Sequence, residues 1–262
     1  MGHAGSDIFH PRLSRACQLT LGLLVVAAPE AVRIATFNVE TLGEPRSGAA
    51  NLAERIAVIR PQLLRLRADL LCLQEVDAQH GGRSKARTLS ALDALVADTP
   101  YASCRRITTT SRSRGGPRDK HNLVILSRLP IAEERQVFHD LVAPPLFRRP
   151  AAAAGGAHSD GSEIEWDRPF LYTRVALADG RSLHLINVHL RAPRAAYLPG
   201  EKAAGGGWRT MAGWAEGFCI AAVKHAVQAL EVRLFVETLF DADPAPLIVV
   251  CGDFNAAAHE VP

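Results

Sequence analysis

Four strongly apolar runs, each ending in polar residues, constrain the fold of this chain more than any other feature. They cover residues 32–40, 69–77, 182–190 and 246–253. The run "DLLCLQEVD" at residues 69–77 is apolar on both faces, which is typical of a central strand of a sheet. Helical periodicity predicts helices elsewhere, at residues 51–68, 86–97 and 214–240. In the first of these, Asn51 is predicted as the N-cap, and Pro61 is expected to kink the helix or to start a second one.

The connections between strands favour antiparallel sheets. Asp179 and Gly180 separate two strand runs, and an Asp-Gly step in this position predicts a β-hairpin. Three more strands are predicted in succession, near residues 104–110, 122–126 and 131–138, which also indicates antiparallel neighbours. The sequence therefore predicts an α+β fold, a four-layer αββα sandwich of two mainly antiparallel sheets flanked by helices.

Composition places the chain among ordinary globular proteins. It has 262 residues, of which 48% are hydrophobic and 22% are charged, so a sizeable core can form without disulfides. The formal net charge of +3 is too small to indicate nucleic-acid binding by itself. Because the five cysteines form no CxxC pair and the histidines form no HxxxH pair, a zinc hydrolase is the least favoured class of enzyme.

Residues 1–31 are predicted to be an extension that precedes a domain at residues 32–262. Within the extension, "LTLGLLVVAA" at residues 19–28 resembles the core of a secretory signal and is too short to span a bilayer. The acidic Asp7 and the lack of a small-residue cleavage site favour an uncleaved extension instead. We therefore expect a cytoplasmic protein in preference to a secreted one, with no stable membrane insertion.

Polar side chains stand at the ends of the apolar runs, where strands leave the core. Each of them alone has a structural explanation, because asparagine and aspartate cap turns and helices, and a buried histidine is often hydrogen-bonded. Because all of them stand at strand ends, we expect them to share one function. The residues are Asn38, Glu75, His189, Asp253 and Asn255.

Five short motifs carry a resemblance to a known family. They are "TFNVE", "LQEVD", "HNLVILSRLPI", "NVHL" and "GDFN", in this order. Together they resemble the endonuclease/exonuclease/phosphatase superfamily, whose fold is that of pancreatic deoxyribonuclease. The resemblance implies a Mg²⁺-dependent hydrolase of phosphoesters, a phosphodiesterase, nuclease or phosphatase, in which a water attacks in line with the leaving group.

The resemblance also implies a role for each polar residue at the strand ends. Glu75 would be the main carboxylate ligand of Mg²⁺, with Mn²⁺ as an alternative ion, and Asn38 would contact the metal site or the phosphate. His189 would contact the scissile phosphate, and Asp253 would orient or deprotonate the attacking water. Asn255 would hold both Asp253 and a phosphate oxygen.

Substrate contacts are expected beside a basic loop at residues 108–121. The loop either grips phosphates or is a solvated hairpin tip, and Arg118 and Asn122 are predicted to contact the substrate. No apolar surface helix is expected, so DNA or a small phosphodiester is favoured as the partner over a membrane lipid. The basic residues of the loop are Arg112, Arg114, Arg118, Lys120 and His121.

The C-terminal end departs from the pattern of the superfamily. Its members carry an aspartate–histidine pair on a final strand well beyond "GDFN", whereas His259 lies only four residues beyond Asn255. The expectation is a domain that is incomplete at its C-terminus, with its last strands missing. The alternative function is a catalytically inactive remnant that binds phosphate or nucleic acid without the final histidine.

Overall fold

The computed structural model describes residues 31–43, 51–80, 86–149 and 161–257. Ala31–Pro262 form one compact unit. The signal-like run at residues 19–28 and His259 lie outside the described residues.

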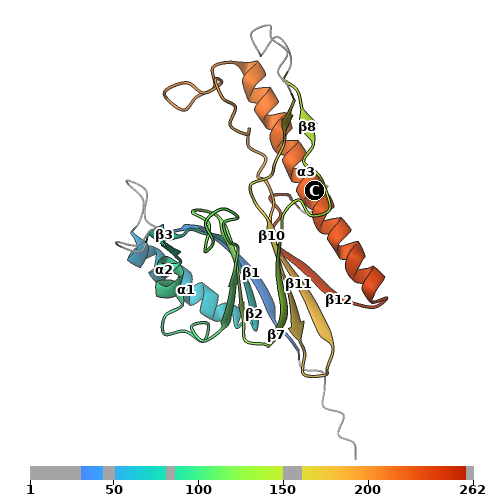
Figure 1. Cartoon of the computed structure of the whole chain (residues 1–262). Helices are drawn as coiled ribbons and strands as arrows, with labels where there is room; N and C mark the ends of the chain where they lie inside the picture. The colour runs from blue at the N-terminus through green and yellow to red at the C-terminus, as the bar shows by residue number, and fades with distance from the viewer. Residues whose placement is uncertain (1–30, 44–50, 81–85, 150–160, 258–262) are drawn as a thin grey trace, which may run out of the picture. The chain divides into compact units, whose positions relative to one another are not determined.

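Two four-stranded sheets form the centre of this unit in the described part of the chain (Figure 1). The first has the order β1 (Ile34–Leu42), β2 (Leu70–Val76), β6 (Asn122–Ser127) and β5 (Arg105–Thr108). The second has the order β12 (Leu247–Asp253), β11 (Ser182–His189), β10 (Phe170–Ala176) and β7 (Ile131–Val137). In each sheet the first two strands of this order are parallel, and the other pairs are antiparallel.

Two short ribbons lie outside these sheets. They are β3 (Gln79–His80) with β4 (Arg87–Thr88), and β8 (Leu146–Phe147) with β9 (Ser162–Glu163). The second ribbon falls within the stretch at residues 140–168, which is rich in proline, alanine and glycine.

The sheets pack face to face through alternate residues of their strands. Leu70 and Cys72 of β2 are fully buried against Leu171 and Leu185 of the second sheet. Leu71, which lies between them in sequence, belongs instead to the cluster on the outer side of the first sheet. The hairpin predicted at residues 179–180 joins β10 to β11. The α+β sandwich of two mainly antiparallel sheets is therefore confirmed.

Helices α1 (Leu52–Leu66) and α2 (Ser90–Val96) cover the outer face of the first sheet (Figure 1). The Asn51 side chain accepts from Glu54 N, and the Glu54 side chain accepts from Asn51 N in return, so α1 begins with a capping box. Pro61 lies inside α1, which continues past it as one helix. Helix α2 begins later than residue 86, because residues 87–88 pair with β3.

Helix α3 (Met211–Ala242) packs against the second sheet, with Val232 and Phe235 buried against Phe170 and Tyr172 (Figure 1). Its N-terminal half exposes apolar side chains, among them Met211, which is 77% exposed. The expectation that the protein has no apolar surface helix is therefore wrong. No helix in the described segments has a stretch apolar and long enough to cross a membrane.

A buried polar bridge joins the two sheets. Asn187 of β11 donates to the carbonyl oxygens of Leu73 and Val124, both at 3.1 Å, and accepts from Gln74 Nε2 at 2.7 Å. Gln74 and Asn187 are 1% and 0% exposed, so these hydrogen bonds form away from water and hold the sheets in register. The bridge lies one residue before Glu75 and two residues before His189, and it therefore supports the polar ends of both strands.

Candidate active site

Strand ends from both sheets meet at one place. In each sheet the two parallel strands end there, and the antiparallel strand beside them begins there. The first sheet supplies Asn38, Glu75 and His121, and the second supplies Asp253, His189 and Arg168.

Glu75 projects from an irregular position in β2. The register of β2 against β6 shifts between Leu73 and Val76, and Glu75 has a positive φ of 61°. Burial of the Glu75 carboxyl group opposes ionisation. Hydrogen bonds from Asn38 and Thr41, and the charge of His189 when its ring is protonated, outweigh burial, so the pKa of Glu75 lies below its ordinary value. Glu75 is therefore an ionised carboxylate at neutral pH.

The side chain of Asn38 links the carboxylates of the two sheets. Its Nδ2 donates to Glu75 Oε1 at 3.3 Å and to Asp253 Oδ2 at 2.8 Å, while its Oδ1 accepts from Glu40 N at 2.8 Å. Glu75 and Asp253, far apart in sequence, therefore lie beside the same amide group. Asn38 turns its amino group toward them, so a direct metal contact through its oxygen stays a prediction.

His189 lies against both carboxylates. Its Nε2 is 3.6 Å from Glu75 Oε1 and 3.7 Å from Asp253 Oδ2, and its side chain is 2% exposed. Burial, together with the positive charge of Arg168, lowers the pKa of His189 to about 4, even though the two carboxylates act in the opposite direction. The imidazole is therefore neutral at pH 7.

A second histidine, His121, completes this side of the site. Its ring lies edge-on to that of His189, with centroids 6.1 Å apart, and its backbone N–H donates to Asp77 Oδ1 at 2.9 Å. Its φ of 55° places it, like Glu75, in the left-handed region, and such conformations cluster at functional sites. Burial and then the charge of Arg168 lower the pKa of His121, which favours its neutral form.

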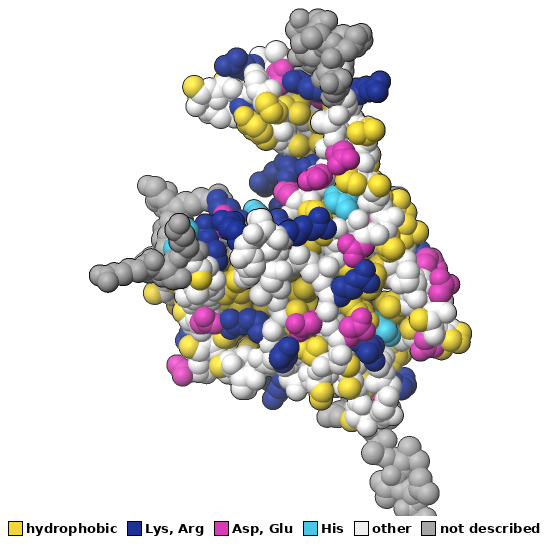
Figure 2. All heavy atoms as spheres, in the orientation of Figure 1, with side chains coloured by type: hydrophobic (Ala, Val, Ile, Leu, Met, Phe, Trp, Pro, Cys, Tyr) yellow, Lys and Arg dark blue, Asp and Glu magenta, His cyan; other side chains and the backbone are white. Residues whose placement is uncertain are grey.

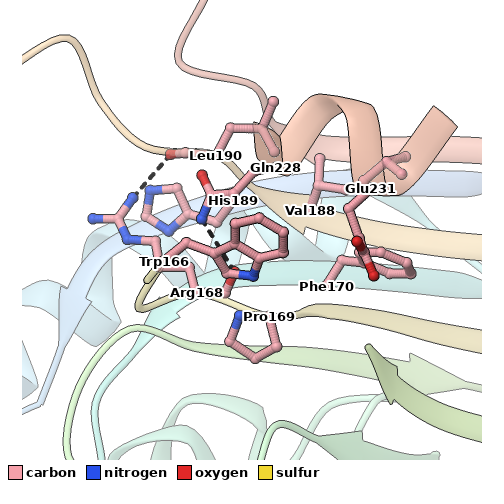
Figure 3. Close-up of a pocket in the computed structure, with 10 residues that line it drawn as sticks. Trp166, Arg168, Pro169, Phe170, Val188, His189, Leu190, Gln228 and Glu231 are labelled. Carbon is pink, nitrogen blue, oxygen red and sulfur yellow. Dashed lines mark hydrogen bonds between the residues drawn. The ribbon is translucent and has the colours of Figure 1, made fainter. Parts of the chain in front are cut away.

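Arg168 brings a positive charge to the site from the start of β10. One of its terminal nitrogens, Nη1, donates to the carbonyl oxygen of Leu190 at 3.0 Å, the contact drawn beside His189 in Figure 3. Its Nε is buried and has no partner within the protein. Burial lowers the pKa of Arg168, but a guanidinium stays charged at neutral pH.

The loop after β12 holds Asp253 in place. Asn255, at φ 50°, donates from its backbone N–H to Asp253 Oδ1 at 2.8 Å. Its side-chain Nδ2 donates to the carbonyl oxygen of Leu190 at 2.9 Å. Asn255 therefore holds Asp253 through its backbone, and its predicted contact with a phosphate oxygen stays a prediction.

The two residues predicted to contact substrate have different positions. Asn122 is fully buried, and its amide bonds only to Thr109, to the backbone of Arg118 and to the carbonyl oxygen of Val76. It supports the segment that carries His121, and a substrate contact through it stays a prediction. Arg118 is half-buried and its Nη2 donates to the carbonyl oxygen of Asp167.

Arg118 lines a cleft of about 530 Å³ that reaches His121 and Arg168. Other basic side chains of the same wall come from the loop between β5 and β6, and Figure 2 shows Lys and Arg side chains gathered on this part of the surface. The Arg112 guanidinium lies over the Phe138 ring, 4.2 Å from its centroid. The basic residues that line the cleft are Arg112, Arg114, Arg118, Lys120 and Arg168.

The donors at this site fit a divalent cation. Two carboxylates held beside one amide repel each other, and a cation between them would remove that repulsion. Glu75 and Asp253 supply the hard oxygen donors that Mg²⁺ and Mn²⁺ prefer. Ligand atoms of Glu75, His121 and His189 also lie within 4.8 Å of one another, and both histidines have a buried Nδ1 without a hydrogen-bond partner.

His121 was predicted only as a member of the basic loop and Arg168 was not predicted at all, although the sequence holds a signal that places both at the site. A strand that begins beside the end of an antiparallel neighbour brings its preceding residues to the same place. Asn122 pairs with Val76, so His121 lies beside the end of β2, and β10 begins beside the end of β11. The predicted hairpin at Asp179–Gly180 therefore already placed Arg168 near His189.

Solved structures of three proteins share this fold. A truncated TDP2 from Caenorhabditis elegans is 15% identical over 88% of this chain and 65% of its own, with a TM-score of 0.50. A mannosyl-6-phosphatase from Bacteroides thetaiotaomicron is 14% identical over 88% of this chain and 67% of its own, with a TM-score of 0.51. A β-hairpin deletion mutant of beta toxin from Staphylococcus aureus is 16% identical over 88% of this chain and 69% of its own, with a TM-score of 0.52.

The present chain spans 65–69% of the length of these three proteins. At such low identities the likeness shows the fold alone, and no curated protein matches the chain. Residues 35–262, however, match the Endonuclease/Exonuclease/phosphatase family, and they include every residue of the site described above. The chain therefore belongs to the endonuclease/exonuclease/phosphatase family.

Proposed function

We propose that this chain hydrolyses a phosphoester, with a divalent metal ion, Mg²⁺ or Mn²⁺, held at Glu75. The observation that carries the proposal is the meeting of Glu75 and Asp253 at the amide of Asn38, with the neutral His189 within 3.7 Å of both carboxylates. Opposite sheets supply the two carboxylates, so the fold itself assembles the pair. The family match supports a hydrolase of phosphoesters as the broad class.

Each residue has a distinct part in the proposed reaction. When bound, the metal ion neutralises charge on the phosphate. Asp253 accepts a proton from the attacking water, and the N–H of Asn255 holds its carboxylate in position. The neutral His189 donates a hydrogen bond from Nε2 to a non-bridging phosphate oxygen, and Arg168 offers its unpartnered Nε to the charge that grows there.

The basic cleft supports a substrate that extends beyond the scissile group. Four cationic side chains from the loop between β5 and β6 line the cleft with Arg168, and Asp119 and Asp167 only partly offset their charge. A second phosphate would bind there by charge-assisted hydrogen bonds. We therefore propose DNA or a small phosphodiester as the substrate.

Two kinds of ion fit this site, depending on which residues bind the ion. Glu75 with oxygen donors alone suits Mg²⁺, whereas Glu75 with the imidazoles of His121 and His189 suits Mn²⁺ and other transition ions. Calorimetric titration with each ion separates them. If His121 is a ligand, His121→Gln weakens Mn²⁺ binding about tenfold or more and leaves Mg²⁺ binding unchanged.

The activity is tested with bis(p-nitrophenyl) phosphate and plasmid DNA, in Mg²⁺, in Mn²⁺ and after chelation. Asp253→Asn is expected to lower kcat/KM by about 10²- to 10⁴-fold, because it removes the proton acceptor and keeps the shape of the side chain. Glu75→Gln is expected to weaken ion binding as well. Glu134→Gln, which alters an exposed carboxylate on β7, is the matched control.

Two outcomes would contradict the proposal. Activity that survives chelation and both substitutions would exclude the site. If the protein instead bound phosphodiesters in the presence of metal and never hydrolysed them, that result would favour a binding protein that has kept the metal-binding residues but not the activity.

A further inference from the structure

The outward face of helix α3 is apolar for most of its length. Every exposed position between Met211 and Leu230 carries an apolar side chain. Their spacings of three and four residues place them on one side of the helix. They are Met211, Ala212, Trp214, Ala215, Phe218, Cys219, Ala222, Ala226 and Leu230.

Two polar side chains of the same stretch, Glu216 and Gln228, are buried, and the other two, Lys224 and His225, are half-buried. Glu216 is 9% exposed and forms an ion pair with Arg149 at 2.9 Å. Gln228 is 4% exposed; it accepts from Arg191 N and donates to the carbonyl oxygen of Arg168. From Met211 to Leu230 the exposed positions are therefore apolar while Glu216 and Gln228 are buried, the reverse of an ordinary surface helix.

This apolar face is large for a surface that meets water. At about 1.5 Å per residue, Met211 to Leu230 span about 29 Å. Met211, Trp214, Phe218 and Leu230 are 77%, 42%, 41% and 45% exposed, and the Trp214 and Phe218 rings stack with centroids 5.8 Å apart. Monomeric proteins rarely expose a contiguous apolar patch of this kind without a partner.

The order of side-chain sizes along the face indicates what covers it. The bulky residues Met211, Trp214 and Phe218 lie in the N-terminal half, together with the small Ala212 and Ala215. The C-terminal half carries the small residues Ala222 and Ala226, with the bulky Leu230 only at its end. An antiparallel copy of the same helix would place large against small. With a two-fold axis near Ile220, Phe218 faces Ala222 of the partner subunit, and Trp214 faces Ala226 of the partner subunit.

We propose that α3 packs antiparallel against α3 of a second copy of this chain, through the face from Met211 to Leu230. A two-fold pair uses the same patch on both copies, and this patch carries no charge that would repel itself. Stable interfaces bury about 800 Å² per partner, and a contact through a single helix is small on that scale. The dimer is therefore expected to dissociate on dilution.

A membrane surface fits the same face less well. Helices that lie in the membrane interface carry Lys and Arg on their polar side, close to the lipid head groups. Here Lys224 is the one Lys or Arg from Met211 to Leu230 and it is half-buried, and the opposite side of α3 packs on its own chain.

Sedimentation velocity of the full chain over a concentration series tests the proposal. The wild-type protein is expected to shift from monomer to dimer, and Phe218→Glu is expected to stay monomeric with unchanged thermal unfolding. Phe240→Glu is the matched control, because Phe240 is 44% exposed on the same helix and lies beyond the reach of the partner helix. Loss of the dimer in Phe240→Glu would overturn this register.

Cross-linking provides a second measurement. Cys219 is an exposed thiol next to the proposed axis, so mild oxidation with copper phenanthroline should yield a covalent dimer that Cys219→Ser abolishes. A wild-type protein that stays monomeric at all concentrations would overturn the proposal. Flotation of a monomer with phosphatidylcholine or phosphatidylserine vesicles, lost in Phe218→Glu, would also overturn it in favour of a lipid surface.

Discussion

The two sheets have the same strand arrangement and contribute different chemistry. In each, a parallel pair ends at the site and an antiparallel strand begins there. The first sheet supplies Glu75 with the neutral partners Asn38 and His121, and the second supplies Asp253 with His189 and the cation Arg168. The first sheet is thus suited to hold a metal ion, and the second to act on water and phosphate.

The backbone also differs between the sheets. The first sheet aims its residues with irregular backbone, since Glu75 lies at a register shift and both Glu75 and His121 have positive φ. The second keeps the register of β11 and β12 as far as His189 and Asp253, and uses a glycine for close approach. The same strand topology therefore positions ligands in two ways, by irregular backbone in the first sheet and by regular strands with a closely packed glycine in the second.

The largest expected effect tests the division of roles. Arg168→Met should lower kcat/KM by about 10²- to 10³-fold, because it removes a charge beside the phosphate site. It should not weaken metal binding, because the charge that it removes repels a cation. Steady-state kinetics and calorimetric titration with Mn²⁺ measure the two quantities separately. Arg168→Lys, which keeps the charge, should recover part of the rate. If metal affinity fell together with kcat/KM, the second sheet would also take part in metal binding, and the proposed separation of roles would be wrong.

Gly252 tests the close approach within the second sheet. It has φ 138°, and an added Cβ would lie 2.0 Å from Val188 O and 2.7 Å from Val188 N, both backbone atoms. Gly252→Ala should therefore lower the free energy of unfolding by about 3 kcal/mol or more in a urea titration. Gly180→Ala is the control, because Gly180 has φ 83° with open space around its Cβ, so only about 1 kcal/mol is expected. If Gly252→Ala and Gly180→Ala lowered the free energy of unfolding equally, the contact with Val188 would not be the cause of the loss.

The buried bridge between the sheets comes next in size. Asn187→Leu keeps the branched shape of the side chain, with a somewhat larger volume, but removes three hydrogen bonds, to Leu73, Val124 and Gln74. The expected loss is about 2 kcal/mol of unfolding free energy, because the partners stay buried without Asn187. An unchanged melting temperature would show that the sheets are held together by apolar contacts alone.

The smallest effect is expected at the exposed contact between the same two sheets. Arg105 of β5 and Glu134 of β7 form an ion pair at 3.3 Å, with side chains 63% and 48% exposed. Glu134→Gln should change the free energy of unfolding by less than about 0.5 kcal/mol, because water screens exposed ion pairs. A loss as large as that of Asn187→Leu would reverse this ranking of buried and exposed bridges.

Features that depend on neighbouring residues were predictable from the sequence. The Asn51 cap and the Asp179–Gly180 hairpin follow from local hydrogen bonding and turn geometry, and both are present. The polar residues at strand ends were also visible, because an apolar run that stops at a polar residue marks where the chain leaves a core. Parallel strands then bring such ends to the same edge of a sheet.

Features that depend on contacts between distant segments were not predictable in this way. Asn122 lay within a motif that suggested a substrate contact, yet packing turns its amide into the protein. Helical periodicity located the long helix near its observed bounds, but the way its polar residues turn inward was not foreseen, because their partners Arg149 and Arg191 lie on separate loops.

The sequence by itself determined the strands, the helices and the set of polar residues available for chemistry, because apolar periodicity and turn residues act over a few neighbours. Only the tertiary structure decided which of those residues meet. Asn38 contacts both Glu75, 37 positions away, and Asp253, 215 positions away. His121 and Arg168 enter the site because their strands run antiparallel to β2 and β11. Such encounters depend on how two sheets stack and in which register, and no local pattern along the chain encodes that geometry.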